Sequence, residues 1–139
     1  MLKITPVYIA EVHATGGRNG HVKSTDGIID LDTAIPTGMG GTGGHKTNPE
    51  QLFAAGYAAC FGGAIGWVGK GKDISGFTIQ AQVGFGKSEE GIYGINAKLE
   101  VHFPNLSIEE GQQIVDAAHQ VCPYSQATRG NIEVIVTAV

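Results

Sequence analysis

The chain has 139 residues, a length that predicts a single domain over residues 1–139 and leaves little room for a second. Hydrophobic residues make up 42% and charged residues 16%, so there is enough apolar material for a core and too little charge for a disordered protein. The formal net charge of −4, with nine Lys and Arg residues scattered along the chain, lacks the basic stripe of nucleic-acid binders.

The beginning of the chain shows no apolar block of the kind found in secretory signals, and no run reaches the roughly 18 apolar residues of a membrane span. We therefore expect a cytosolic protein without a membrane partner. Only two cysteines occur, Cys60 and Cys122. A reducing cytosol disfavours a purely structural disulfide, so this pair is more often catalytic, redox-active or metal-binding.

The first third of the chain predicts a β-meander followed by a loop. Residues rich in β-formers predict a strand from Pro6 to Thr15, and the turn Gly16–Gly20 follows it. Shorter strands are expected at His21–Thr25 and Gly27–Leu31. The glycine-rich segment Pro36–Lys46 is expected to be a loop.

A strong helix start follows this loop, with Asn48 as N-cap, Pro49 in the first helical position and Glu50 in the first turn. The helix should run from Pro49 to about Gly69. Its interior is almost entirely small or apolar, which predicts burial on all sides. Each interior glycine costs about 0.5–1 kcal/mol relative to alanine, which suggests that another backbone passes close by.

The remainder predicts a hairpin, a second helix and a last strand. Period-two alternation marks strands at Phe77–Gly86 and Ile92–Phe103. Ser107 and Glu110 form a capping box at the start of the second helix, and the final strand covers Asn131–Val139. The order βββ-α-ββ-α-β lacks the regular alternation of a doubly wound sheet and predicts an α+β fold.

Three motifs are similar to those of nucleotide-binding, thiol-redox and metal-binding sites. Gly38–Gly43 matches G-x-G-x-x-G, but the next helix starts only at Asn48, and no parallel partner strand with an acidic residue for the ribose follows, as a dinucleotide site requires. Cys122–Ser125 is similar to a thiol-redox motif, but it ends a helix, where the helix dipole opposes a thiolate. His119 and Cys122 are spaced as two ligands of a metal site could be, and Cys60 and His45 would have to complete that site.

Cys60 has two interpretations, a small buried hydrophobe or a reactive thiol. Burial raises the pKa of a thiol, and a guanidinium in contact opposes that effect. An ion pair at about 4 Å and an effective dielectric of about 20 contributes roughly 4 kcal/mol before desolvation, and keeping about 2 kcal/mol lowers the pKa by about 1.5. Arg18, on its glycine-flanked turn, is the candidate cation, and Glu50 is the candidate carboxylate that holds it in place.

Two long segments resemble the signatures of a known family. Asn48–Phe61, NPEQLFAAGYAACF, resembles the signature helix of the organic hydroperoxide resistance proteins, within the wider OsmC/Ohr group. Val121–Ile132, VCPYSQATRGNI, is similar to their second signature, and the turn Gly16–Gly20 matches as well. The likeness covers essentially the whole chain, and the two long segments together are highly specific.

The resemblance implies an OsmC-like α+β fold in which antiparallel β-sheets wrap around long central helices in an intertwined homodimer. It also implies a thiol peroxidase, without metal or organic cofactor, that reduces organic hydroperoxides, including those of fatty acids, to alcohols. Cys60 would be the peroxidatic cysteine and Cys122 the resolving one, while Arg18 and Glu50 tune the thiolate. Lipoyl groups on partner proteins would return the reducing equivalents.

Substrate preference and site assembly are further expectations. An apolar wall would favour greasy peroxides over hydrogen peroxide, with candidates Ile35, Met39, Phe53, Tyr57 and Phe77. Glu50 and Cys60 lie ten residues apart, about 15 Å along one helix, so one guanidinium does not easily reach both within one chain. If two copies cross antiparallel at Ala54–Gly56, each site draws on both chains.

Three other functions stay open on sequence grounds. A general osmotic-stress member of the same group would have a broader peroxide preference. A non-catalytic protein that binds apolar ligands would use the same pocket with an inert Cys60. A metal-binding module is the third alternative.

Overall fold

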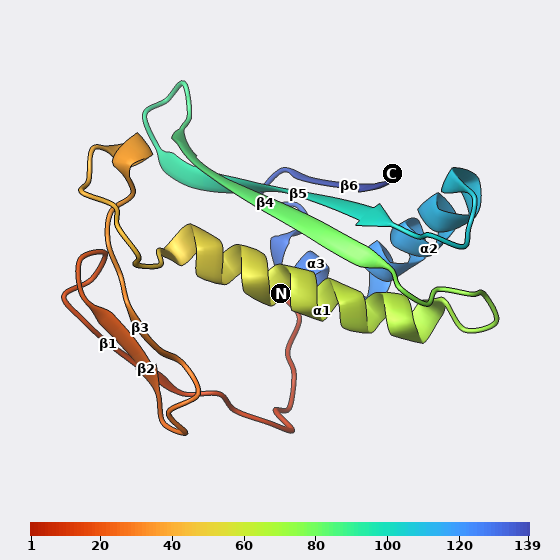
Figure 1. Ribbon diagram of the computed structural model, residues 1–139, viewed down its shortest axis with the longest axis horizontal. Coiled ribbons are helices and arrows are strands. Elements are labelled where there is room, and N and C mark those ends of the chain that lie inside the picture. Colours follow the sequence, from red (N-terminus) through yellow and green to blue (C-terminus); the bar gives the residue numbers. More distant parts are fainter. The chain divides into compact units, whose positions relative to one another are not determined.

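The computed structural model describes residues 1–139, which form two compact units, Met1–Pro49 and Glu50–Val139 (Figure 1). The first unit is built on an antiparallel sheet of three short strands in the order β1-β2-β3. The strands are β1 (Val12–Thr15), β2 (His21–Ser24) and β3 (Asp30–Asp32). The predicted meander is therefore confirmed.

The first strand is shorter than predicted, because it begins at Val12 and not at Pro6. Val12 pairs with Ser24, the last residue of β2, so the residues before Val12 have no partner strand within this sheet. The glycine-rich segment after β3 is a loop, as expected, with one short 3-10 helix, η1 (Thr37–Met39).

The second unit contains a long helix, a hairpin, two further helices and a last strand (Figure 1). These elements are α1 (Pro49–Val68), β4 (Thr78–Lys87), β5 (Tyr93–His102), α2 (Ile108–Val121), α3 (Pro123–Thr128) and β6 (Val134–Ala138). The sequence does not predict α3, because a proline directly after a helix is a typical stop signal. Proline is equally favoured at the first position of a new helix, which is where Pro123 lies.

The sheet of this unit is mixed, with the strand order β4-β5-β6. The hairpin strands β4 and β5 are antiparallel, as predicted, but β6 runs parallel to β5, with Leu99 opposite Val136. The predicted α+β fold with antiparallel strand pairing is confirmed, and the parallel β6 makes this sheet mixed. The physical reason is the connection, because α2 and α3 carry the chain back along the sheet before β6 begins, and parallel strands require such a crossover.

The core of this unit lies between one face of the sheet and the helices. Alternate residues of β5 are buried, whereas the alternate positions of β4 that include Gln80 and Gln82 are exposed. The buried core consists of Tyr57, Phe61, Ala64, Ile65, Ala97, Leu99, Val101, Phe103, Ile114, Val115, Ala118 and Cys122. Helix α1 and the α2–α3 segment thus meet over the sheet, and each carries one of the two cysteines.

Helix α1 is less buried than its composition predicts. Ala55, Ala59, Gly63 and Gly66 are exposed, and Trp67 is 64% exposed, so the helix is not covered on all sides within this chain. By length and mean hydropathy it is also apolar enough to cross a membrane, a test that the core helix of a soluble protein passes as well. A search for an uninterrupted apolar run does not detect this property, which depends on the mean hydropathy of the helix.

The capping box at the start of α2 is confirmed, because the Ser107 hydroxyl accepts from the Glu110 amide and the Glu110 carboxylate accepts from the Ser107 amide. We expect Ser107→Ala to lower the free energy of unfolding by about 1 kcal/mol, because an N-cap acceptor is lost. Denaturant unfolding measures this change. Ser107→Asn keeps an N-cap acceptor and is the matched control, so an equal loss in both variants would contradict a capping role.

Candidate functional site

The two cysteines lie side by side. Cys60 is in the middle of α1, and Cys122 is the residue between α2 and α3. Their Sγ atoms are 3.6 Å apart, with the Cys122 thiol placed to donate to the Cys60 sulfur. Both are free thiols, Cys122 fully buried and Cys60 partly exposed. Because a disulfide needs an S–S distance of about 2.05 Å, a small local shift brings the two sulfurs into bonding range.

The surroundings of Cys60 within its unit disfavour the thiolate. Burial raises the pKa of the Cys60 thiol, the neighbouring Cys122 thiol raises it further, and the backbone N–H of Tyr124 opposes both by donating to the sulfur. This N–H belongs to the first turn of α3, where backbone amides have no partner inside the helix. A thiolate at Cys60 therefore needs a positive charge in addition to this amide.

Aromatic rings from α1 and α3 pack together beside a cavity. The ring centroids of Phe53 and Tyr124 are 5.9 Å apart, and those of Tyr57 and Tyr124 are 5.6 Å apart. Phe53 and Tyr124 line a cavity of about 410 Å³, which is completed by Ile95, Ala127, Thr128, Asn131 and Ile132. Sequence reasoning did not predict this role for Tyr124, whose signal was its place one residue after Pro123 in the second signature.

The remaining candidates for the apolar wall lie in several places. Tyr57 is fully buried behind Phe53 and Tyr124, with its hydroxyl bonded to other side chains, so it supports this cavity without lining it. Phe77 packs beside the core, with its ring 6.0 Å from that of Phe103. Ile35 and Met39 belong to the first unit, where Met39 is exposed in η1.

Within this chain, the atoms that come closest to Gly56 of α1 belong to a side chain. A Cβ atom at Gly56 would lie 2.7 Å from the hydroxyl oxygen of Tyr124, so only glycine lets that ring approach the helix. Gly63 and Gly66, by contrast, have open space around them. Within this chain the expected close backbone at the α1 glycines is therefore not found.

Arg18 lies on the turn between β1 and β2, which is tightly held inside the first unit. The hydroxyl of Thr33 donates to the Gly17 carbonyl at 3.0 Å and accepts from the Gly20 amide at 2.9 Å. Thr33 is only 3% exposed, so water hardly competes for these bonds. One side chain thus fixes the backbone on both sides of Arg18.

Glu50 lies in the first turn of α1, and Cys60 follows ten residues later on the same unbroken helix. At 1.5 Å per residue the two positions are about 15 Å apart along the axis.

The structure contains no group of three or more His, Cys, Asp or Glu side chains arranged to hold a metal ion. Of the metal-site candidates, His119 lies 2.8 Å through Nδ1 from the Ser125 hydroxyl.

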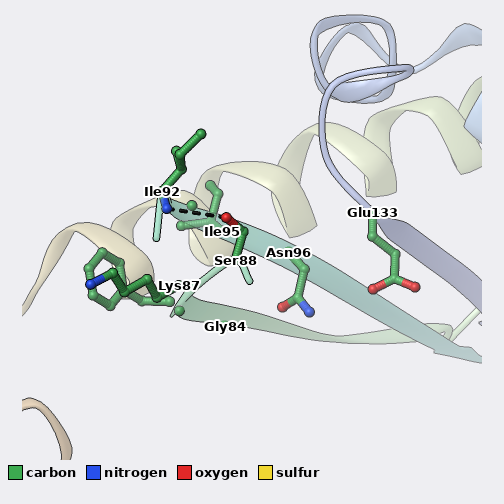
Figure 2. Close-up of a pocket in the computed structure, with 10 residues that line it drawn as sticks. Gly84, Lys87, Ser88, Ile92, Ile95, Asn96 and Glu133 are labelled. Carbon is green, nitrogen blue, oxygen red and sulfur yellow. Dashed lines mark hydrogen bonds between the residues drawn. The ribbon is translucent and has the colours of Figure 1, made fainter. Parts of the chain in front are cut away.

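A second cavity, of about 510 Å³, lies at the far end of the β4–β5 hairpin (Figure 2). Lys87, Asn96 and Glu133 are among its lining residues, and the Ile92 amide donates to the Ser88 hydroxyl at 3.2 Å. None of the residues singled out from the sequence lines this cavity. Neither cysteine is among its lining residues.

Comparison with known proteins adds a family. Residues 41–137 match the family model described as OsmC-like protein. The chain is 48% identical over 132 residues to the organic hydroperoxide resistance protein OhrB of Bacillus subtilis, covering 92% of this chain and 95% of that protein. It is also 48% identical over 134 residues to the organic hydroperoxide resistance protein of Xanthomonas axonopodis pv. citri, covering 94% of each.

Solved structures of similar proteins have the same fold. The crystal structure of OhrB of Bacillus subtilis superposes with a TM-score of 0.87 at 45% identity, covering 96% of this chain and 100% of that one. An organic hydroperoxide resistance protein from Elizabethkingia anophelis gives a TM-score of 0.89 at 45% identity, covering 97% and 98%.

Proposed function

Because this chain belongs to the OsmC-like family and, within it, to the organic hydroperoxide resistance proteins, we propose that it reduces organic hydroperoxides, including those of fatty acids, to alcohols. The observation that carries this proposal is the 3.6 Å separation of the Cys60 and Cys122 sulfurs, one partly exposed and one buried. An accessible thiol beside a protected one is the arrangement that a two-cysteine peroxidase needs.

The proposed reaction begins at Cys60. Its thiolate attacks the outer peroxide oxygen, the O–O bond breaks, and the alkoxide takes a proton to become the alcohol, leaving Cys60 as a sulfenic acid. The Cys122 sulfur then attacks that of Cys60, a disulfide forms, and the hydroxide leaves as water with the Cys122 proton. An external dithiol reopens the disulfide by exchange. We propose a lipoyl group on a partner protein for this role.

Arg18 and Glu50 complete the proposed machinery. Burial raises the pKa of Cys60, so the guanidinium of Arg18 is proposed as the charge that restores the thiolate and that stabilises the developing negative charge on the peroxide. Glu50 is proposed to orient that guanidinium. The apolar cavity beside Phe53 and Tyr124 supports a preference for hydroperoxides with hydrocarbon chains.

The cysteine variants test the proposal directly. Cys60→Ser is expected to abolish peroxide reduction, because the nucleophile is lost. Cys122→Ser should react once and then stop recycling with a dithiol. Stopped-flow oxidation with a fatty-acid hydroperoxide and with hydrogen peroxide, followed by reduction with lipoamide or thioredoxin systems, measures both steps. Multiple turnover in either variant would contradict the roles, and equal rates with both peroxides would favour a general osmotic-stress peroxidase.

The pH dependence tests the role of Arg18. Attack requires the thiolate, so the rate rises with pH through the Cys60 pKa and then levels off. Removing a cation that stabilises the thiolate raises this pKa, so Arg18→Ala should shift the whole profile to higher pH and slow attack at neutral pH. Arg129→Ala, at the other arginine of the chain, is the matched control. An identical profile in Arg18→Ala and the unsubstituted protein would contradict the role.

The active form is proposed to be a homodimer with shared sites. The 15 Å or so between Glu50 and Cys60 along α1 supports this, because a partner helix running antiparallel brings its own Glu50 near this Cys60. The crossing was expected at Ala54–Gly56, but Tyr124 covers Gly56. The exposed small residues Ala55 and Ala59 are the better support for a close approach.

Mixing two inactive variants tests the shared site. A heterodimer of Cys60→Ser and Glu50→Gln chains would contain one site with an intact Cys60 from one chain and an intact Glu50 from the other. We therefore expect the unfolded, mixed and refolded pair to recover up to about a quarter of the full activity, since half of the random dimers carry one of two sites. Activity no higher than the average of the separate variants would show that each chain supplies its own Glu50.

A binder of apolar ligands is the second candidate function. The raised pKa of the partly buried Cys60 thiol favours it, because a protonated thiol is a poor nucleophile. The same cavity would then hold the ligand without any reaction. Peroxide consumption by the protein distinguishes the two, since a binder leaves the peroxide concentration unchanged.

A further inference from the structure

A chain of hydrogen bonds links the three helices that surround the sulfur pair. The Tyr57 hydroxyl of α1 lies 3.0 Å from the Ser125 hydroxyl of α3, and Nδ1 of His119 in α2 lies 2.8 Å from the same Ser125 oxygen. Tyr57 and Ser125 have no exposed surface. A buried hydroxyl that loses its partner is destabilising, so these hydrogen bonds hold the three helices in one arrangement.

One assignment of the protons satisfies every group. The Thr128 hydroxyl donates to the Tyr124 carbonyl at 2.9 Å. Ser125 then donates to a neutral His119 and accepts from Tyr57. Burial, with the positive charge of Arg129, lowers the pKa of His119, while Asp116 opposes them. The neutral imidazole that this assignment requires is therefore the favoured form at neutral pH.

The position of Ser125 connects these hydrogen bonds to the two sulfurs. Ser125 follows Tyr124, whose amide donates to Cys60, and lies one helical turn after Cys122. Tyr57 lies one turn before Cys60 on α1. The bond between Tyr57 and Ser125 therefore fastens the start of α3 to the same part of α1 that carries Cys60.

We propose that Ser125, held between Tyr57 and His119, is a positioning residue that keeps Cys122 and the Tyr124 amide against Cys60. The role of Ser125 during turnover, which is to help the Cys60–Cys122 disulfide to close, rests on the proposed peroxidase function. The pairing of the two sulfurs, however, is a property of the fold that can be measured without any peroxide. Loss of the Ser125 hydroxyl should loosen the pair and leave both thiols in place.

Equilibrium with glutathione measures this pairing. The Cys60 thiolate attacks glutathione disulfide and releases one glutathione, and Cys122 then attacks the Cys60 sulfur of the mixed disulfide and releases the second. The ratio of oxidised to reduced protein in buffers of known glutathione composition gives the effective concentration of one sulfur near the other. Because a misplacement of about 1 Å can reduce a positioned reaction by up to a hundredfold, we expect a decrease of about tenfold or more in Ser125→Ala.

Tyr57→Phe is the second variant, because it keeps the buried ring and removes only the hydroxyl. It should lower the effective concentration to a similar extent. Ser107→Ala is the matched control, since it removes a hydroxyl from the other end of α2, where it caps the helix far along the chain from Cys122. This control should stay within about twofold of the unsubstituted protein, which separates lost positioning from lost stability.

The outcomes are decisive in each case. A folded Ser125→Ala with an unchanged effective concentration overturns the proposal. If that variant does not fold by circular dichroism, Tyr57→Phe decides in its place, and an unchanged value there overturns it. Failure of the proposed peroxidase function gives a different result. The unsubstituted protein would then not consume organic hydroperoxides, while the effective concentration from the glutathione equilibrium would still be lower in Ser125→Ala than in Ser107→Ala.

Discussion

The charge state of Cys60 is the constraint on which the account depends. Burial raises the pKa of its thiol, and the one amide that opposes this effect, from Tyr124, leaves the pKa raised. A nucleophilic Cys60 therefore requires a cation. We propose Arg18 as this cation, and Thr33 fixes the backbone of its turn on both sides of the arginine.

The packing of the second unit explains why the sulfurs meet. Cys122 is fully buried among core residues, and it lies where α2 ends and α3 begins. Gly56 lets Tyr124 press against α1, and the amide of that same tyrosine points at Cys60. The arrangement buries one thiol and leaves the other partly exposed, which suits a reaction in two steps.

Local patterns were enough to predict much of this fold. The period-two strands of the hairpin and the capping box at Ser107 are found as predicted, because both signals lie within a few residues of the structure they produce. The direction of β6 was missed, since it depends on how α2 and α3 return along the sheet. Helix α3 was missed because Pro123 ends one helix and begins the next.

The candidate site shows the same division between local and distant information. The cysteines are 62 residues apart, so their pairing came from the resemblance of two segments and not from spacing. The contact between Gly56 and Tyr124 joins residues far apart in the chain, and no periodicity reports it. The hydroxyl of Tyr57, a candidate for the apolar wall, lies 3.0 Å from that of Ser125, 68 residues away, a contact that no local pattern predicts.

Direct titration of the Cys60 thiol tests the central claim. The ultraviolet absorbance of the thiolate, followed from acid to alkaline pH in the Cys122→Ser protein, reports one thiol alone because the chain has no other cysteine. The account predicts a pKa below the ordinary thiol value of about 8.5, because the guanidinium outweighs the effect of burial. A pKa at or above the ordinary thiol value of about 8.5 would contradict it, because most of the sulfur would then be protonated where the protein is proposed to act.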